Sequence, residues 1–222
     1  PLKIGWFHIS ADIENSSPTK GLPENASEVL NQIRSRISFL MVGRVEPRKG
    51  HAQVLAAFEQ LWRDGLNVNL VIVGRRGWMV EGLIGTLSHH PELGKRLFWL
   101  EGISDEYLER IYGSCKCLIS ASLAEGFGLP LIEAAQHEVP IIARDLPVFR
   151  EVAEDHAFYF KGDDPSDLAE AIKEWLALFK EGRHPKSEGM RWLTWEESAK
   201  DLLDIILKNR WYVIYDSSKT AK

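Results

Sequence analysis

Short apolar runs alternate with amphipathic helical stretches from residue 37 onward, and this alternation constrains the fold more than any other feature of the sequence. The runs are apolar through their centres, as is typical of strands buried on both faces of a parallel sheet. The expected strands are Ile37–Val42, Val68–Val73, Leu97–Leu100, Cys117–Ser120, Pro140–Ala143 and Ala157–Phe160. The expected helices are Ala52–Arg63, Val80–Ser88, Asp105–Tyr112, Pro130–Gln136, Val148–Glu154 and Pro165–Phe179. Strands and helices in this order predict an α/β fold with a doubly wound parallel sheet.

The chain divides into three regions. Residues 37–180 hold all of these strands and helices and are expected to form one Rossmann-like domain. Residues 1–36 contain one possible strand, Ile4–Ile9, and a segment rich in Asn, Ser, Pro and Gly, which favours an interdomain strand and linker. Residues 181–222 begin with a polar loop and continue into an expected helix over Thr194–Asn209 and a frayed tail.

Composition narrows the classes of protein that the chain can belong to. The 222 residues carry a formal net charge of −5, which argues against a non-specific nucleic-acid binder because such proteins usually have a basic face. No apolar run approaches the roughly 18 residues that a membrane-spanning helix needs. The only cysteines are Cys115 and Cys117, and no set of His and Cys residues completes a metal site. We therefore expect two free thiols in a cytoplasmic protein.

A basic segment follows the first expected strand of the sheet, where ligands of doubly wound folds bind. This segment, Gly43–Gly50, opens a helix, so backbone N–H groups and the positive end of the helix dipole face the carboxyl edge of the sheet. Arg44 and Lys49 add full charges that suit phosphate, and Arg48 can add a third. The spacing is not that of a P-loop. Taken alone, the segment is equally well interpreted as a solvated basic turn.

A second candidate segment begins where the expected strand Cys117–Ser120 runs into a Gly-x-Gly turn and a helix. Gly126 and Gly128 carry no side chains, so a ligand can approach the main chain closely. Pro130 lies at or near the first helical position. The N–H donors at the start of this helix suit a diphosphate.

Two carboxylates flank this turn, Glu125 before it and Glu133 after it. A capping box would need a carboxylate at the third helical position and a Ser or Thr cap. With Pro130 as the first helical residue, Glu133 is the fourth, and Leu129 stands in the place of the cap. A capping role for Glu133 is therefore disfavoured. A carboxylate, which only accepts hydrogen bonds, suits vicinal hydroxyl groups of a ligand instead.

The pair Glu125-x7-Glu133, with Gly-Phe-Gly-Leu-Pro between the two glutamates, resembles the paired-glutamate motif of retaining glycosyltransferases of the two-Rossmann-domain (GT-B) type. More narrowly it resembles family 4, many of whose bacterial members build O-antigen and other surface polysaccharides. The segment Gly43–Gly50 at the end of the first strand makes the resemblance specific. It is strong over residues 37–160 and weak at Ala11–Gly21 and Trp192–Ile206. It implies the C-terminal, donor-binding half of such an enzyme.

The resemblance also implies roles for individual residues. Arg44 and Lys49 would hold the diphosphate of a nucleotide-sugar donor, and Glu125 would contact the sugar that is transferred. Glu133 would accept hydrogen bonds from the ribose hydroxyls. Main-chain groups would line the rest of the donor site, with Gly102 and Ile103 at the base and Gly43, Gly126, Phe127, Gly128 and Leu129 at the sugar and phosphates. The loop at Gly102 is equally well an ordinary turn with Ser104 as the helix cap.

The sequence therefore predicts transfer of a hexose, with retention at the anomeric carbon, to a saccharide or lipid-linked acceptor in polysaccharide or lipopolysaccharide synthesis. The segment Trp192–Ala199 favours the bacterial mannosyltransferases that use GDP-mannose. No cofactor and no metal are expected, because Asp163-Asp164 precedes Pro165 and is interpreted as a helix cap. A missing N-terminal domain should complete the acceptor side, so the chain alone should bind donor without transferring it. Peripheral association of the full enzyme with the inner face of the membrane is expected.

Two other functions remain open at this level. A module that binds nucleotide sugars without catalysis would keep Arg44, Lys49 and Glu133 and transfer nothing. A nucleotide-sugar epimerase or a phosphorylase could use the same architecture. A phosphorylase of that type needs a lysine that bears pyridoxal phosphate, and no motif in the sequence indicates one.

Overall fold

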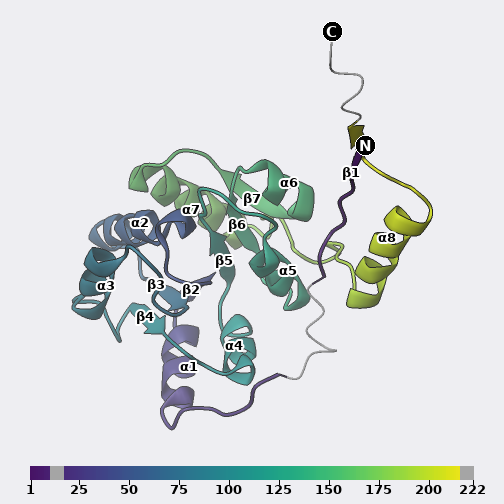
Figure 1. Cartoon of the computed structure of the whole chain (residues 1–222). Coiled ribbons are helices and arrows are strands. Elements are labelled where there is room, and N and C mark those ends of the chain that lie inside the picture. The colour runs from purple at the N-terminus through teal and green to yellow at the C-terminus, as the bar shows by residue number, and fades with distance from the viewer. Residues whose placement is uncertain (11–17, 216–222) are drawn as a thin grey trace. The chain divides into compact units, whose positions relative to one another are not determined.

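The computed structural model describes residues 1–10 and 18–215 of the chain (Figure 1). The chain forms two compact units. The larger is Ser17–Met190, and the smaller combines Pro1–Ser16 with Arg191–Lys222. The larger unit carries the predicted sheet, and the smaller carries one helix and a short pair of strands.

The larger unit is built on one six-stranded sheet in the order β4-β3-β2-β5-β6-β7, and neighbouring strands in it run parallel (Figure 1). This is the 3-2-1-4-5-6 order of a Rossmann fold. The strand order reverses between β2 and β5, which pair over two residues, Phe39 with Cys117 and Leu40 with Leu118. The strands are β2 (Ile37–Val42), β3 (Val68–Val73), β4 (Leu97–Leu100), β5 (Cys117–Ser120), β6 (Ile141–Arg144) and β7 (Ala157–Phe160).

Helices cover the sheet because each crossover between parallel strands is right-handed and changes face where the strand order reverses. Contacts between helices follow this arrangement: α2 packs with α7, α1 with α4, and α5 with α6. The helices of this unit are α1 (Ala26–Arg34), α2 (His51–Arg63), α3 (Glu81–Ser88), α4 (Asp105–Tyr112), α5 (Leu129–Gln136), α6 (Pro147–Ala153) and α7 (Pro165–Lys180).

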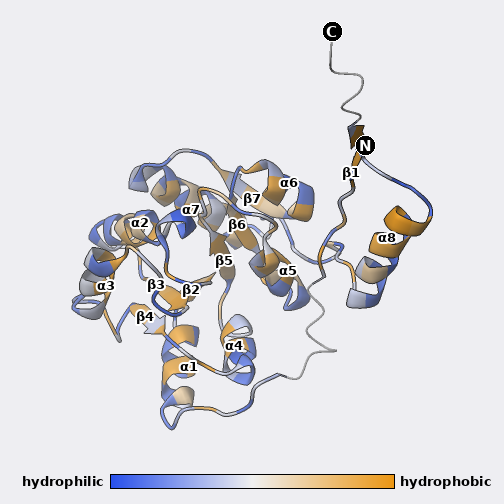
Figure 2. Ribbon diagram, in the orientation of Figure 1, coloured by the Kyte–Doolittle hydropathy of each residue, from blue (hydrophilic) through white to orange (hydrophobic). Residues whose placement is uncertain are grey.

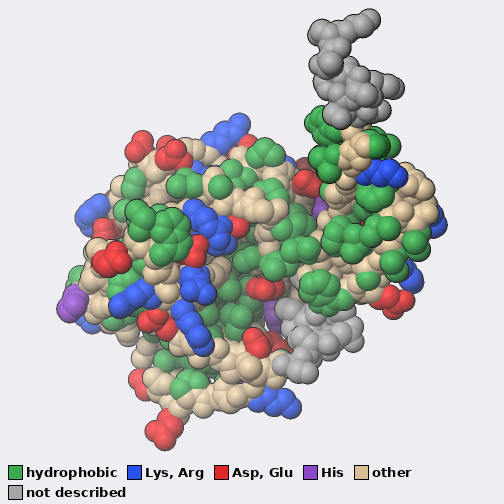
Figure 3. All heavy atoms as spheres, in the orientation of Figure 1, with side chains coloured by type: hydrophobic (Ala, Val, Ile, Leu, Met, Phe, Trp, Pro, Cys, Tyr) green, Lys and Arg blue, Asp and Glu red, His purple; other side chains and the backbone are tan. Residues whose placement is uncertain are grey.

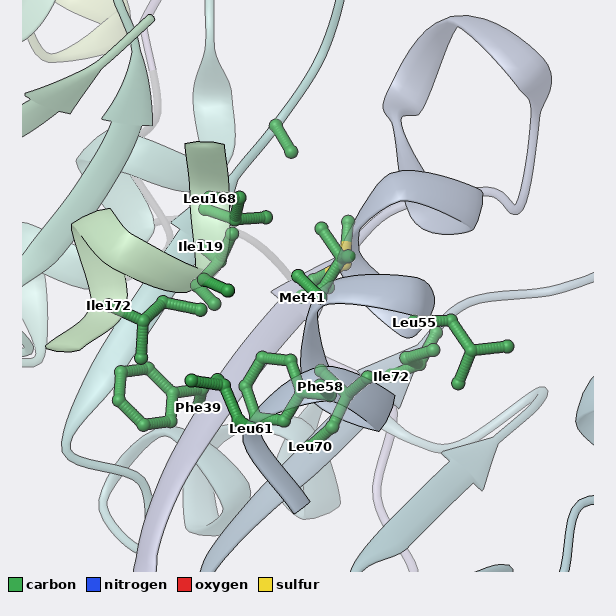
Figure 4. Packing of buried hydrophobic residues seen from close by; sticks show 14 of the residues in the cluster. Phe39, Met41, Leu55, Phe58, Leu61, Leu70, Ile72, Ile119, Leu168 and Ile172 are labelled. Carbon is green, nitrogen blue, oxygen red and sulfur yellow. The ribbon is translucent and has the colours of Figure 1, made fainter. Parts of the chain in front are cut away.

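The hydrophobic core lies between the sheet and the pair α2 and α7. Phe39 of β2 is fully buried and packs edge-to-face with Phe58 from α2, with 5.6 Å between the ring centroids (Figure 4). Trp175 from α7 packs edge-to-face with Phe39 as well, with 5.5 Å between the centroids. Edge-to-face pairs of this kind add to the free energy gained from burial. The hydropathy colouring shows hydrophobic residues predominating in the central strands, whereas the helices carry both hydrophobic and hydrophilic segments (Figure 2). The doubly wound α/β fold that the sequence predicts is confirmed.

Most boundaries lie within one residue of the prediction. β2, β3, β4, β5 and β7 have the predicted bounds, and β6 begins at Ile141 instead of Pro140 because proline cannot donate to a strand ladder. The compact unit, however, is longer than the predicted domain of 37–180 and reaches Met190, whose side chain is buried. It also includes α1, which the sequence analysis placed in the linker. Leu30 and Ile33 are buried on this helix, and its C-terminal end is held by a 2.5 Å hydrogen bond from Ser38 Oγ to the carbonyl of Ile33.

The smaller unit pairs the two ends of the described chain. β1 (Leu2–Ile4) runs antiparallel to β8 (Val213–Tyr215). The predicted strand Ile4–Ile9 was wrong over most of its length, because it shares only Ile4 with β1, and β8 was not predicted. Helix α8 (Trp195–Leu207) starts at a capping box made by Thr194 and Glu197. Among the described residues, no helix is long and apolar enough to cross a membrane.

Candidate functional site

Two loops meet at the carboxyl edge of the sheet, at the point where the strand order reverses. Gly43–Gly50 follows β2, and the segment from Ala121 follows β5. Gly50 has a positive φ of 76°, and a Cβ atom there would overlap the carbonyl oxygen of Ala121. The N–H of Leu123 donates a 2.7 Å hydrogen bond to the carbonyl of Arg48. Glycine at position 50 thus lets the two loops lie in direct contact.

A cluster of charged side chains fills this junction, with Glu125 at its centre. Lys49 Nζ forms an ion pair with Glu125 Oε1, and Arg48 Nη1 lies 3.2 Å from Glu125 Oε2. Ser122 Oγ donates a 2.7 Å hydrogen bond to Glu125 Oε1. The side chains of Lys49 and Glu125 are only 15% and 11% exposed, so water screens this pair little.

The protonation of Glu125 follows from these contacts. Burial alone would raise its pKa, but hydrogen bonds from Lys49 and Ser122, together with the charges of Lys49 and Arg48, outweigh burial and lower the pKa below its usual value. Glu125 is therefore an ionised carboxylate at neutral pH. Its cationic partners come from the loop after the neighbouring strand.

Arg44 lies at the exposed rim of this cluster. Its side chain is 62% exposed, and its only ion pair among the described residues is a long one, 3.7 Å from Nε to Glu46 Oε1. Glu46 is shared with Arg48 Nε at 3.1 Å. Arg44 is thus free to turn toward a ligand at the sheet edge, whereas Arg48 and Lys49 already have carboxylate partners. Figure 3 shows Lys and Arg side chains gathered on one face of the larger unit.

Helix α5 begins beside this cluster. Gly128 precedes it with a φ of 117°, and no side chain caps its first N–H groups among the described residues. A Cβ atom on Gly128 would come within 3.1 Å of the ring of Phe149. The turn Gly126–Leu129 therefore depends on glycine, and it presents an uncapped helix N-terminus, which favours anions.

Glu133 lies one turn further along α5. Tyr112 of α4, almost fully buried, donates a 2.9 Å hydrogen bond from its hydroxyl to Glu133 Oε2, and His137 stacks on the Tyr112 ring at 4.8 Å. Burial raises the pKa of Glu133 and the charge of Asp105 raises it further, while the hydrogen bond from Tyr112 opposes both. Because α5 starts at Leu129, the third helical position is Leu131, so Glu133 does not form a capping box.

The remaining predicted residues lie in the loop after β4. Gly102 has a φ of 61°, Ile103 is half-buried, and Ser104 caps α4 by accepting a 3.1 Å hydrogen bond from the N–H of Tyr107. The cap predicted for Ser104 is confirmed. Asp164 likewise caps α7 in a capping box with Asp167. No group of three or more His, Cys, Asp or Glu side chains in the described part of the chain could hold a metal ion.

The structure thus brings Lys49, Glu125 and the start of α5 together, with Arg44 at the rim and Glu133 one turn along the helix. Sequence analysis missed two of the groups that hold the carboxylates, Ser122 and Tyr112. Ser122 could have been found, because it stands three residues before Glu125 in the same loop. Tyr112 carries no local signal, since it reaches Glu133 from a different helix.

The family follows from comparison with known proteins. Residues 24–192 match the model of the family described as "Glycosyl transferases group 1". The chain belongs to this family, and its sheet is the Rossmann-like half of a GT-B glycosyltransferase.

Individual relatives agree with this assignment. The chain is 56% identical over 204 residues to serotype-specific mannosyltransferase WbdA of Escherichia coli, an alignment that covers 91% of this chain and 25% of that protein. It is 30% identical over 149 residues to O-antigen chain mannosyltransferase RfbU of Salmonella typhimurium, covering 67% of this chain and 41% of that protein. The C-terminal domain of the group 1 glycosyl transferase LpcC from Francisella tularensis shares the fold, with a TM-score of 0.58 at 17% identity, covering 82% of this chain and 92% of that domain. The chain spans about a quarter of the length of WbdA.

Proposed function

We propose that the chain binds a nucleoside-diphosphate sugar at the carboxyl edge of its sheet, as the donor domain of a retaining hexosyltransferase. Two of the relatives are named mannosyltransferases, which supports mannose as the transferred sugar, and we propose GDP-mannose as the donor. The acceptor is a growing saccharide or lipid-linked saccharide of a surface polysaccharide. A second, N-terminal domain holds that acceptor, and the enzyme works in the cytoplasm at the inner face of the membrane.

The observation that carries this proposal is the charged cluster at the junction of β2 and β5. Lys49 is paired with Glu125, which stands three residues before Gly128 at the uncapped start of α5, and Arg44 of the same loop as Lys49 adds a second cation at the exposed rim of the cluster. A leaving diphosphate develops negative charge as the bond to the sugar breaks. Preorganised cations and N–H groups stabilise that charge, which is the largest contribution in many transfer reactions. We assign this role to the side chains themselves.

Glu125 acts on the sugar in this proposal. Its carboxylate is held by Lys49, Arg48 and Ser122. An arriving diphosphate competes with Glu125 for Lys49. The carboxylate then becomes available to accept hydrogen bonds from hydroxyls of the hexose and to stabilise positive charge that develops at the anomeric carbon.

Glu133 binds the nucleoside. Tyr112 occupies one of its oxygens, Oε2, so Oε1 is left for the ribose hydroxyls. This contact needs the ionised carboxylate, because a protonated one has lost part of its accepting capacity.

Titration calorimetry of the 222-residue chain with GDP tests the proposal. Each charged hydrogen bond to phosphate contributes roughly 1.5–3 kcal/mol, so Lys49→Ala should weaken binding by about 10- to 150-fold. Arg44→Ala should weaken it toward the lower end of that range, because Arg44 is largely exposed. Lys173→Ala is the matched control, since Lys173 also forms ion pairs but lies on α7. Unchanged affinity in both site variants would refute the diphosphate assignment.

A further inference from the structure

Arg75 lies in the loop after β3 and has no role in the proposed function. Its main chain is fixed on both sides. The N–H of Val45 donates a 3.0 Å hydrogen bond to the carbonyl of Arg75, and the N–H of Arg76 donates a 2.8 Å hydrogen bond to Glu101 Oε1. The loop after β3 is therefore tied to the loop after β2, which carries Arg44 and Lys49, and to the loop after β4.

The guanidinium group of Arg75, by contrast, is unpaired. Across the described ranges 1–10 and 18–215, no carboxylate or carbonyl accepts a hydrogen bond from it, and the residue is exposed. The group lies over Gly102: a Cβ atom there would come within 3.7 Å of Nε and 3.8 Å of Nη2 of Arg75. The N–H donors of the Arg75 guanidinium are therefore available to a ligand that binds beside Gly102.

The position of Gly102 relative to the proposed ribose contact at Glu133 indicates which part of the ligand would reach Arg75. Glu133 is linked to α4 through Tyr112, and the charge of Asp105, in the first turn of α4, also acts on Glu133. The loop with Gly102 leads directly into that turn. A nucleoside whose phosphates lie at Lys49 and whose ribose lies at Glu133 would therefore extend its base toward Gly102.

We propose that Arg75 recognises the base of the donor and that this base is guanine. The inference rests on the proposed function and deepens it. The guanidinium fork presents two parallel N–H donors and needs two adjacent acceptors. Guanine offers O6 and N7 side by side, whereas adenine offers N7 beside an amino donor. Uracil separates its two carbonyl oxygens by an N–H group. Cytosine pairs N3 with O2, but its O2 lies next to the glycosidic bond, where the ribose crowds it.

Titration calorimetry of the 222-residue chain with GDP, CDP, ADP and UDP tests this assignment. The wild-type chain should bind GDP more tightly than the other three, by about 5- to 150-fold, the range that one bidentate arginine–base contact provides. Arg75→Ala should remove most of that preference and leave the affinity for UDP and ADP within about two- to threefold of wild type. Arg75→Lys keeps the charge but loses the fork, so it should also lose the preference for GDP.

Arg76→Ala is the matched control. It removes the same charge one residue further on, and the main-chain hydrogen bond to Glu101 is kept. It should weaken all four nucleotides by a similar small factor. Thermal unfolding of each variant verifies that the exposed substitutions leave the fold intact.

The outcomes separate the inference from the function on which it rests. Binding of all four nucleotides with equal affinity, or an equal loss for all four in Arg75→Ala, would overturn the role of Arg75 in base recognition while the dependence on Lys49 still stands. A preference for CDP that Arg75→Ala removes would overturn the assignment of guanine. Failure of every nucleotide to bind would overturn both the inference and the proposed function.

Discussion

Replacing Glu125 by glutamine should change nucleotide binding and sugar transfer in opposite directions. The substitution keeps the shape of the side chain and removes the charge that pairs with Lys49 and Arg48. A diphosphate would then no longer compete with a carboxylate for Lys49. If the ligand recovers about half of one charged hydrogen bond, worth roughly 1.5–3 kcal/mol, the affinity for GDP should rise by about 3- to 10-fold.

Transfer should respond in the other way. If Glu125 stabilises charge at the sugar, Glu125→Gln should lower the turnover of the intact enzyme by about 100-fold or more. Calorimetry with GDP measures the first effect, and transfer of labelled mannose by the full-length protein measures the second. A collapse of GDP affinity in Glu125→Gln, with Glu133→Gln silent, would show that the roles of the two glutamates are reversed.

The same variant has a pH signature in the absence of ligand. The pKa of Glu125 is lower in the folded chain than in the unfolded chain, so its contribution to stability is present above the unfolded pKa and is lost as the pH falls through the folded pKa. Urea denaturation should therefore find Glu125→Gln less stable than wild type at pH 7, by about 1 kcal/mol after allowance for solvent screening. The difference should shrink toward zero in acid. A difference that stays constant with pH would show that the contacts of Glu125 do not depend on its charge.

Two further predictions concern the ribose contact and the isolated chain. Glu133→Gln should weaken GDP binding, and Tyr112→Phe should weaken it less. Both losses should disappear with 2′,3′-dideoxy-GDP, which lacks the ribose hydroxyls. Calorimetry measures these affinities, and an equal loss with the dideoxy nucleotide would contradict the ribose contact. Because burial raises the pKa of Glu133, wild-type affinity should fall as the pH drops through that pKa, and Glu133→Gln should lack this step. The 222-residue chain should bind GDP-mannose without transferring mannose, because in the proposed function a second domain holds the acceptor; enzyme-dependent transfer to a saccharide acceptor would contradict this.

The sheet could be predicted from the sequence because its signal is local. Each strand is a short apolar run that is buried on both faces, so the bounds of β2 and β3 follow from the residues themselves. Candidate loops followed from the rule that ligands bind at the carboxyl edge. The pair β1 and β8 joins segments about two hundred residues apart in the chain, and nothing in either segment indicates the other.

The site was predictable only in part, for the same physical reason. The charge of Lys49 suggested a phosphate contact and the family resemblance implied a sugar contact for Glu125, but their ion pair depends on how closely Gly50 lets two loops approach. Tyr112 contacts Glu133 from a different helix, and Arg75 lies beside Gly102 of a different loop, so neither contact has a local signal in the sequence. Sequence patterns show which residues lie at an edge of the sheet. They do not show which side chains form ion pairs and hydrogen bonds with one another there.

The seam between β2 and β5 has a consequence for the behaviour of the whole domain. Those two strands share two paired residues, fewer than any other neighbours in the six-stranded sheet as described, whereas β2 and β3 share six. The proposed ligand would contact Lys49, which follows β2, and the start of α5, which follows β5. A bound nucleotide would thus connect the two halves of the sheet at the position where the pairing between strands is shortest. Amide hydrogens of Phe39, Leu40 and Leu118 should exchange measurably more slowly once GDP is bound, because the ligand would stabilise the pairing of β2 with β5 against local opening.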